Sequence, residues 1–378
     1  MSRRINDSYL VRLCRDLVGI RSYSCDEREI AYFIRDTMRD LGYKSRIDEW
    51  GNVIGEIDEG DGRNIVFEGH MDTVTADEKE WKHGPFEGRV EGNRIYGRGT
   101  SDMKGALSAM IYGASMAEIS GKLNVVCVPM EEMFEGILFG KALDNMKPDL
   151  VVLGESTELN LNIGQRGRAE IVVETKGIPA HSSNPEKGVN AVYEMMPVIE
   201  RIRDLKLPED QFLGNAVIEL TDIISCPYPG ASVIPYRCRA TFDRRLMLGE
   251  DEIGVIEHMR SFIKEGDTTI TIAEGSSKTY TGRDISARKF FPAWKVSEEN
   301  DLVKKSFDAL NGINADLKLS RYSFCTDGSE SAGRRGITTI GFGPSRESIA
   351  HTDDEYVEIR DLVKSCEGYI AIAEALLS

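Results

Sequence analysis

The sequence predicts an α/β protein in which a catalytic α/β domain with a central mixed sheet is interrupted by a smaller α+β lid domain. In the first part of the chain, short apolar runs that predict buried strands alternate with helical patterns. Near residue 169 the pattern becomes typical of a compact insertion with its own antiparallel sheet, and the last part returns to helices with a strand. We therefore expect a catalytic domain made of residues 1–166 and 285–378, with residues 167–284 inserted as the lid.

Two amphipathic helices are predicted at the start of the chain. Apolar residues recur every three or four positions over 10–17 and 30–41, and Gly42 stands where the second helix should end. Buried strands are then predicted at residues 65–67, 123–128 and 150–153. A helical pattern over 107–114 separates the first two strands, which is the alternation expected of an α/β sheet.

The lid and the last part of the chain have patterns of their own. In the lid we expect a strand at 171–176, a helix at 189–202, a second strand ending near Asp243, a helix at 252–263 and a third strand at 268–272. After the lid we expect a helix at 301–310, a strand at 338–342 and a helix at 359–377. No repeat or long linker marks the boundaries of the insertion.

The charge balance argues against nucleic-acid binding. The chain has 47 Lys and Arg against 63 Asp and Glu, a formal net charge of −16, whereas phosphate recognition needs a clustered basic face. Its 7 cysteines include no Cys-x-x-Cys pair, which indicates reduced thiols in a cytoplasm rather than a disulfide framework or a thiolate zinc cluster. The longest apolar stretch, 123–130, is far below the roughly 18 residues that span a bilayer. We therefore expect a cytoplasmic protein that binds neither nucleic acid nor membrane.

Polar residues follow each of the three predicted strands of the first part directly. These are His70 and Asp72 after the first strand, Glu131 and Glu132 after the second, and Glu155 after the third. Because ligands in open α/β sheets gather at the carboxyl ends of strands, these side chains are expected to converge. Taken alone, Glu131 and Glu132 would be interpreted as a solvated loop pair, but their position directly after an apolar strand favours a site.

Asp102, in a glycine-rich loop, and His351 extend this set of imidazoles and carboxylates. Such a mixture without thiolate suits zinc, cobalt or manganese, and the number of groups is about what two neighbouring metal ions need. Asp102 could also cap a helix that begins near Lys104, a role that does not exclude metal binding. His83 and His258 match no metal pattern and are expected to be structural or surface residues.

The motifs that carry these residues are spread over nearly the whole chain. They are Gly-His-Met-Asp-Thr-Val at 69–74, Gly-Arg-Gly-Thr-Ser-Asp-Met-Lys-Gly at 97–105, Glu131-Glu132, Gly154-Glu155, Ala-His-Ser-Ser at 180–183, Asp243-Arg-Arg245 and His351. Together they resemble the zinc-dependent superfamily of aminoacylases, acetylornithine deacetylases, succinyl-diaminopimelate desuccinylases and carboxypeptidase G. Cys-Thr-Asp-Gly at 325–328 and Phe-Pro-Ala-Trp at 291–294 are also similar to segments of hydrolases linked to selenium metabolism.

The resemblance implies two divalent metal ions, zinc before cobalt or manganese, and a ligand for each position. Asp102 would bridge the two ions. His70 and Glu155 would complete one site, and Glu132 and His351 the other.

Three further residues have catalytic roles by the same resemblance. Asp72 would accept the second N–H of His70 and so fix its tautomer. Glu131 would take the proton of the metal-held water and deliver it to the leaving nitrogen. His181, in the lid, would donate to the oxyanion of the tetrahedral intermediate, often from the partner subunit of a dimer, so that a homodimer through the lid is expected.

Substrate recognition is implied at two places. Arg245 occupies the position that grips a free carboxylate, where a guanidinium fork fits two oxygens. Thr326 and Gly328 fall in a turn that resembles a substrate-lining loop. One departure is Ser232 before Val-Ile-Pro, where many relatives carry Asn, so the specificity of well-known members is not transferred.

We therefore expect a metallohydrolase that cleaves the amide bond of an N-acyl or carbamoyl-type amino acid with a free carboxylate. An alternative is a metallo-dipeptidase or aminopeptidase, which would require recognition of a free α-amine. An alternative from another class is a non-catalytic metal-binding scaffold, against which the presence of every ligand and of Glu131 argues.

Overall fold

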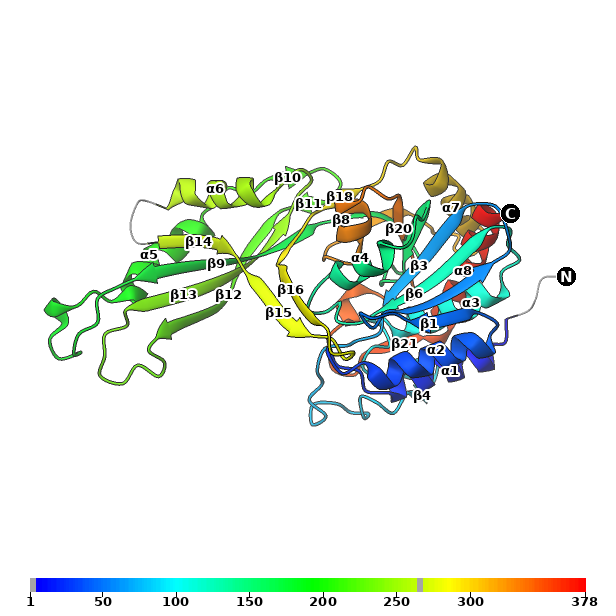
Figure 1. Cartoon of the computed structure of the whole chain (residues 1–378), viewed down its shortest axis with the longest axis horizontal. Coiled ribbons are helices and arrows are strands. Elements are labelled where there is room, and N and C mark those ends of the chain that lie inside the picture. The colour runs from blue at the N-terminus through cyan, green and yellow to red at the C-terminus, as the bar shows by residue number, and fades with distance from the viewer. Residues whose placement is uncertain (1–4, 264–267) are drawn as a thin grey trace.

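The computed structural model describes residues 5–263 and 268–378 and confirms the α/β architecture. Figure 1 shows two parts along the long axis of the molecule, a large sheet flanked by helices at one end and a narrower sheet with two helices at the other. The C-terminus lies in the first part. Within the described residues, no helix is both long enough and apolar enough to cross a membrane.

The large sheet has nine strands in the order β1-β2-β6-β3-β7-β20-β8-β18, with β19 paired to β8. Its strands are β1 (Lys44–Ile47), β2 (Val53–Asp58), β3 (Asn64–His70), β6 (Lys122–Val128), β7 (Leu150–Leu153), β8 (Leu161–Gln165), β18 (Trp294–Lys295), β19 (Leu319–Tyr322) and β20 (Thr339–Gly341). The central strands β6, β3, β7 and β20 run parallel. Their carboxyl ends therefore meet at one edge, as expected for a ligand site.

Helices cover both faces of this sheet. They are α1 (Asp7–Gly19), α2 (Arg28–Asp40), α3 (Lys104–Met116), α4 (Ile137–Leu143), α7 (Asp301–Asn311) and α8 (Ile359–Leu377). Neighbouring strand residues belong to different cores: Phe67 packs with α3 and α8, whereas Val66 packs with Phe139 of α4. Burial on both faces explains why these strands are continuous apolar runs rather than alternating ones.

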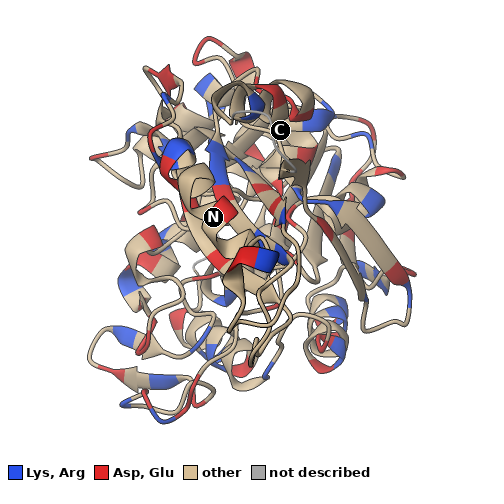
Figure 2. Cartoon of the chain, turned by 90° about the vertical axis from the view of Figure 1, so that its left-hand side faces the viewer, with Lys and Arg blue, Asp and Glu red and all other residues tan. Residues whose placement is uncertain are grey.

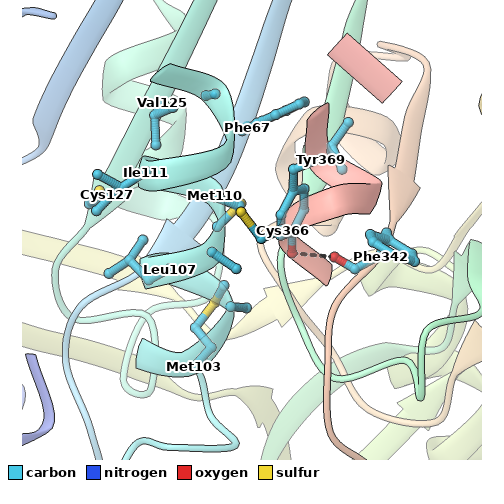
Figure 3. Close-up of a cluster of buried hydrophobic side chains, with 14 of the residues drawn as sticks. Phe67, Met103, Leu107, Met110, Ile111, Val125, Cys127, Phe342, Cys366 and Tyr369 are labelled. Atoms are coloured by element: carbon cyan, nitrogen blue, oxygen red, sulfur yellow. Dashed lines mark hydrogen bonds between the residues drawn. The ribbon is translucent and has the colours of Figure 1, made fainter. Parts of the chain in front are cut away.

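The larger core lies between the sheet and the helices α3 and α8. Figure 3 shows Leu107, Met110 and Ile111 of α3 among strand residues and side chains of α8. Tyr369 of α8 is fully buried, and its hydroxyl donates to the carbonyl oxygen of Phe342, 2.5 Å away. A buried tyrosine whose hydroxyl is paired adds little desolvation cost, so this contact ties α8 firmly to the end of β20.

The second sheet is antiparallel, in the order β12-β13-β9-β14 with β17 paired to β9. Its elements are β9 (Gly167–Lys176), β12 (Val217–Cys226), β13 (Arg237–Leu246), β14 (Thr268–Ile272), β17 (Phe290–Phe291), and the helices α5 (Ala191–Arg203) and α6 (Glu252–Phe262). The two helices pack on one face and enclose a separate core. We call this unit the lid sheet.

The chain enters and leaves the lid sheet at one place. Gly167 begins β9, and a Cβ atom there would lie 2.4 Å from the carbonyl oxygen of Phe291 and from the amide nitrogen of Ala293. A side chain at this position would therefore collide with the returning chain. The two connections between the sheets are packed backbone against backbone.

The predicted helices and most predicted strands are present within a few residues of the expected bounds. One strand was expected to end near Asp243, but the structure has two there, β12 and β13. The prediction missed β12 because it is an edge strand with mostly exposed side chains and little apolar alternation.

A polar hairpin, β15 (Glu274–Lys278) and β16 (Asp284–Arg288), was also missed. Its turn reaches the other part of the molecule, where the hydroxyl of Tyr280 donates to the carbonyl oxygen of Gly51 at 2.7 Å. The remaining short elements are β4 (Arg89–Glu91), β5 (Arg94–Tyr96), β10 (Glu209–Asp210), β11 (Gly214–Asn215), β21 (Tyr356–Glu358), the 3₁₀ turns Pro185–Lys187 and Glu347–Ile349, and a π-helical turn at Ser329–Arg334.

Candidate metal centre

The polar residues after β3, β6 and β7 converge at the carboxyl edge of the large sheet, together with the loop before α3. The Nε2 atom of His70 lies 2.8 Å from Oδ1 of Asp102 and 3.7 Å from Oε1 of Glu155. His70 ends β3, and Glu155 lies two residues beyond β7, its parallel neighbour in the sheet. The parallel register therefore explains why residues 85 positions apart in the chain meet here.

His351 approaches the same loop from the opposite side. Its Nε2 atom lies 3.1 Å from Oδ2 of Asp102 and 3.0 Å from Oε1 of Glu132. One oxygen of Asp102 therefore faces His70, and the other faces His351. A carboxylate placed between two imidazoles in this way has the arrangement that a bridging ligand requires.

Two groups of side chains have donor atoms that all lie within 4.8 Å of one another: His70 with Glu131 and Glu155, and His70 with Asp102 and Glu132. Burial and the charge of Asp102 raise the pKa of both Glu132 and Glu155. Burial likewise raises the pKa of Glu131, to which neighbouring carboxylates add. Four carboxylates facing two imidazoles form a donor set that calls for cations, so the residues fit divalent metal ions.

The two histidines can carry part of the positive charge that these carboxylates require. Hydrogen bonds with Asp102 and Glu132 raise the pKa of His351 to about 10. Burial alone lowers the pKa of His70, but hydrogen bonding to Asp102 and the nearby carboxylates outweigh it and raise the pKa well above its ordinary value. Burial raises the pKa of Asp102, but hydrogen bonds from both histidines outweigh this and hold it below its ordinary value. The carboxylates therefore favour the protonated form of both imidazoles where no metal ion faces them.

Asp72 is fully buried beneath the centre. The Nδ1 atom of His70 lies 2.9 Å from the backbone oxygen of Asp72 and 3.6 Å from its carboxylate, so the backbone rather than the carboxylate is the nearer partner. The carboxylate accepts instead from the amides of Glu131 at 3.0 Å and Glu132 at 3.3 Å, and from the hydroxyl of Ser24 at 2.6 Å. Asp72 thus positions the two glutamates as well as the histidine.

Sequence reasoning missed Glu355, which holds the loop that presents Asp102. Its fully buried carboxylate accepts from the amides of Ser101 at 2.7 Å, Asp102 at 3.1 Å and Gly99 at 3.1 Å, and from the guanidinium of Arg98 at 2.7 Å. The N-cap of α3 is Met103, so Asp102 does not cap this helix with its side chain. Glu355 lies in an acidic stretch, and nothing in that stretch distinguishes the one buried carboxylate.

His181 is not brought to the centre within the single chain. It is exposed in a loop after β9, where its Nδ1 atom lies 2.7 Å from the hydroxyl oxygen of Ser183 and accepts from the amide of Ser183 at 3.1 Å. Over the described ranges, no hydrogen bond or ion pair joins His181 to a candidate metal ligand.

The predicted substrate residues lie near the junction of the two sheets. Arg245 is on β13, with its Nε atom 2.8 Å from Oδ1 of Asp243. Thr326 is fully buried, donating its hydroxyl to Oε1 of Gln165 at 2.5 Å and accepting from the amide of Gly328 at 3.0 Å. The hydroxyl of Thr326 is therefore engaged by Gln165 of β8 and by the amide of its own turn.

The other two histidines lie outside both groups of donor atoms. His83 is buried, with Nε2 3.0 Å from a carboxylate oxygen of Glu91. His258 lies on α6 of the lid, with Nδ1 3.4 Å from a guanidinium nitrogen of Arg244.

Comparisons with known proteins identify the family of the chain and relatives of its fold. Residues 66–375 match the model of Peptidase family M20/M25/M40. The chain is 32% identical to the uncharacterized protein YgeY of Escherichia coli K12 over 96% of this chain and 93% of that protein. It is 28% identical to acetylornithine deacetylase of Buchnera aphidicola over 79% and 77% of the two chains. An M20 family metallo-carboxypeptidase of Sulfolobus solfataricus has the same fold, with a TM-score of 0.76 over 99% of each chain at 17% identity.

Proposed function

Since the chain belongs to Peptidase family M20/M25/M40 and is a metallohydrolase of amide or peptide bonds, we propose that it removes an acyl or carbamoyl-type group from an amino acid that keeps a free carboxylate. The observation that carries this proposal is the position of Asp102, with one carboxylate oxygen on each of two histidines. The pair of Asp102 with His70 is largely buried, and a buried ion pair is costly to form, whereas His351 is half exposed. Peptides with a free carboxylate belong to the same substrate class.

Two divalent metal ions fit this donor set, and we propose that Asp102 holds both. His70 and Glu155 would complete one site, and Glu132 and His351 the other. When bound, the ions, zinc before cobalt or manganese, would polarise the substrate carbonyl and lower the pKa of a water molecule. Proton transfer and substrate binding are then proposed for side chains of the protein.

Glu131 is the proposed proton carrier. Its carboxylate is buried beside His70 and Glu155, and its backbone amide donates to Asp72, which fixes its direction. Burial and neighbouring carboxylates raise its pKa, which favours accepting a proton from water. Glu131 would then return that proton to the leaving nitrogen of the amide.

Arg245 is the proposed anchor of the substrate carboxylate. About a quarter of its side chain is exposed, and it shares Asp243 with a second arginine, so part of its guanidinium fork is available to a ligand. A free α-carboxylate bound there would orient the amide bond toward the metal centre. This requirement distinguishes deacylation and carboxypeptidase activity from aminopeptidase activity, which depends on a free α-amine.

We propose a homodimer that pairs through the lid. The edge strand β12 and helix α5 carry exposed apolar side chains, among them Ile223, Ile224, Tyr193 and Met196. An exposed apolar edge strand is a template for pairing with a second chain. The partner's lid would then bring a histidine to the metal centre, which His181 does not reach within its own chain.

The test is metal content together with hydrolysis of a panel of N-acyl amino acids, N-carbamoyl amino acids and dipeptides. Hydrolysis should be lost on chelation and return with zinc, cobalt or manganese. Preference for substrates with a blocked amine and a free carboxylate would support the proposal. Preference for dipeptides with a free amine would replace it with a metallo-dipeptidase or aminopeptidase.

A further inference from the structure

Four charged side chains form a continuous chain across the junction between the lid sheet and the loop after β6. The Nε atom of Arg245 lies 2.8 Å from Oδ1 of Asp243, whose Oδ2 atom lies 2.6 Å from Nε of Arg168. The Nη1 atom of Arg168 lies 2.6 Å from Oε1 of Glu135. We call these four residues the charge chain.

The register of the lid sheet explains the first half of the charge chain. Arg245 of β13 stands directly opposite Arg168 of β9, so that two guanidinium groups lie side by side. Like charges directly opposite on a sheet repel each other. Asp243 lies two residues before Arg245 and therefore on the same face. Its Oδ1 atom faces Arg245, its Oδ2 atom accepts from Arg168 and, at 3.5 Å, from Nη2 of Arg245, and its charge offsets the repulsion.

The second half of the charge chain reaches the catalytic loop. Glu135 is 7% exposed, and a buried carboxylate of this kind depends on its ion pair with Arg168. The same loop holds Glu131, and it is a compact turn in which the amide of Phe134 donates to the carbonyl oxygen of Met130 at 2.9 Å. A displacement of Glu135 is therefore transmitted to Glu131.

We propose that Arg168 is a positioning residue that couples recognition of the substrate carboxylate at Arg245 to the placement of Glu131. This inference rests on the proposed function. A substrate carboxylate bound to Arg245 competes with Asp243 for the same guanidinium group. Asp243 then interacts more strongly with Arg168. Arg168, held between Asp243 and Glu135, then fixes the loop of Glu131.

The coupling has a kinetic consequence. Substrates that carry the free carboxylate turn over faster, instead of only binding more tightly, because the carboxylate sets the geometry of the proton carrier. Arg168 therefore acts on kcat through another residue and does not touch the substrate. A clamp that merely joined the two sheets would affect all substrates alike.

The experiment compares each N-acyl amino acid of the panel that is hydrolysed with its carboxamide, in the full-length metal-loaded protein. The variants are Arg168→Gln, Glu135→Gln and the conservative Arg168→Lys. The matched control is Arg237→Gln, because Arg237 pairs with Glu174 across the same two strands at 3.9 Å and is half exposed.

We expect the kcat ratio of carboxylate to carboxamide to fall about tenfold or more in Arg168→Gln and Glu135→Gln, while KM for the carboxylate changes less than about threefold. Arg168→Lys should restore part of the ratio, and Arg237→Gln should leave it unchanged. In hydrogen exchange, the N-acyl amino acid should protect residues 130–136 in the wild type but not in Arg168→Gln.

An unchanged ratio in Arg168→Gln, or an equal fall in Arg237→Gln, would overturn the inference while leaving the proposed function intact. If Arg168→Gln does not fold, the same kcat ratio measured in Glu135→Gln and Arg168→Lys tests the inference. A wild type that hydrolyses carboxylate and carboxamide equally well would instead contradict the proposed role of Arg245, and the inference would fall with it.

Discussion

His351 and His181 are both loop histidines that the sequence assigns to the site, but the fold treats them differently. His351 lies within 3.1 Å of two candidate metal ligands, Asp102 and Glu132. The side chain of His181 bonds within its own turn, to Ser183, and its backbone forms a β-bridge with Val233 of the lid. The candidate metal ligands are therefore brought together by one chain in the described structure, whereas the proposed role of His181 would need a movement of the lid or a second chain.

The charges of the two regions differ as well. The metal centre concentrates buried carboxylates, which only cations can balance. Figure 2 views the molecule from the lid end, where basic and acidic segments are interspersed and much of the ribbon is neither. The lid edge is instead apolar, with Ile223 and Ile224 exposed on β12. Buried charge fixes a geometry within the chain, and an exposed apolar edge indicates a contact outside it.

The largest effect is expected at Glu131. Replacing it by Ala should lower kcat by about 10³-fold or more, because the change removes the proposed proton carrier, while metal content stays unchanged. Steady-state kinetics and metal analysis of the same preparation would check both statements. Full activity in Glu131→Ala would show that Glu131 is not the proton carrier. The proposed division of the centre into metal ligands and one base would then be wrong.

The next effect is expected at the edge of the lid. Replacing Ile224 by Lys should dissociate the dimer and lower kcat by about 10²-fold, because the oxyanion donor would come from the partner. Light scattering after gel filtration and kinetics at matched concentration would measure both. Val90→Lys, at an exposed apolar position on β4, is the control and should change neither. A fully active monomer would show that His181 reaches the site by movement of its own lid.

A smaller effect is expected at Glu355, which fixes the loop of Asp102. Replacing it by Gln leaves at least one buried N–H donor without an acceptor and should weaken metal binding by about 10- to 100-fold. Competition with a chromophoric chelator would measure this, and circular dichroism would check the fold. Glu358→Gln, a nearby part-exposed residue paired with Arg94 at 3.5 Å, should bind metal normally. Equal affinities in the two variants would contradict the role of Glu355.

The sequence predicts the metal side of the molecule better than the lid side for a physical reason. Buried strands are continuous apolar runs, and the residues that directly follow them, such as His70 and Glu155, must lie at one edge of a parallel sheet. The helix at 359–377 was predicted at the residues where it occurs, because its apolar residues follow the helical period.

What the sequence could not show depends on contacts between distant residues. Glu355 is one of three consecutive acidic residues, and only the fold decides that it is the one buried against Ser101 and Asp102. The hairpin of β15 and β16 is polar in sequence, and its place depends on contacts with distant residues, such as those of Tyr280 with Gly51 and of Thr281 with Glu49. Arg168 is placed opposite Arg245 by the register of two strands, and the sequence of neither strand alone specifies that register.

The last prediction concerns the charge of the centre without metal. Hydrogen bonds with Asp102 and Glu132 raise the pKa of His351 to about 10, so this imidazole should stay protonated at pH 8 in the metal-free protein. An ordinary histidine loses its proton near pH 6.5. Proton NMR of imidazole-labelled, metal-free protein would follow the titration, with the signal assigned by its absence in His351→Gln.

A midpoint near pH 6.5 for His351 would mean that the carboxylates do not face it in solution as they do here, and the centre would then be assembled by metal rather than by the chain. A midpoint near 10 would mean that imidazolium holds the ligands together before metal arrives. In that case metal ions replace protons in a ligand geometry that exists before the metal binds. The centre would then be preformed within one chain, unlike the proposed position of His181 at the site.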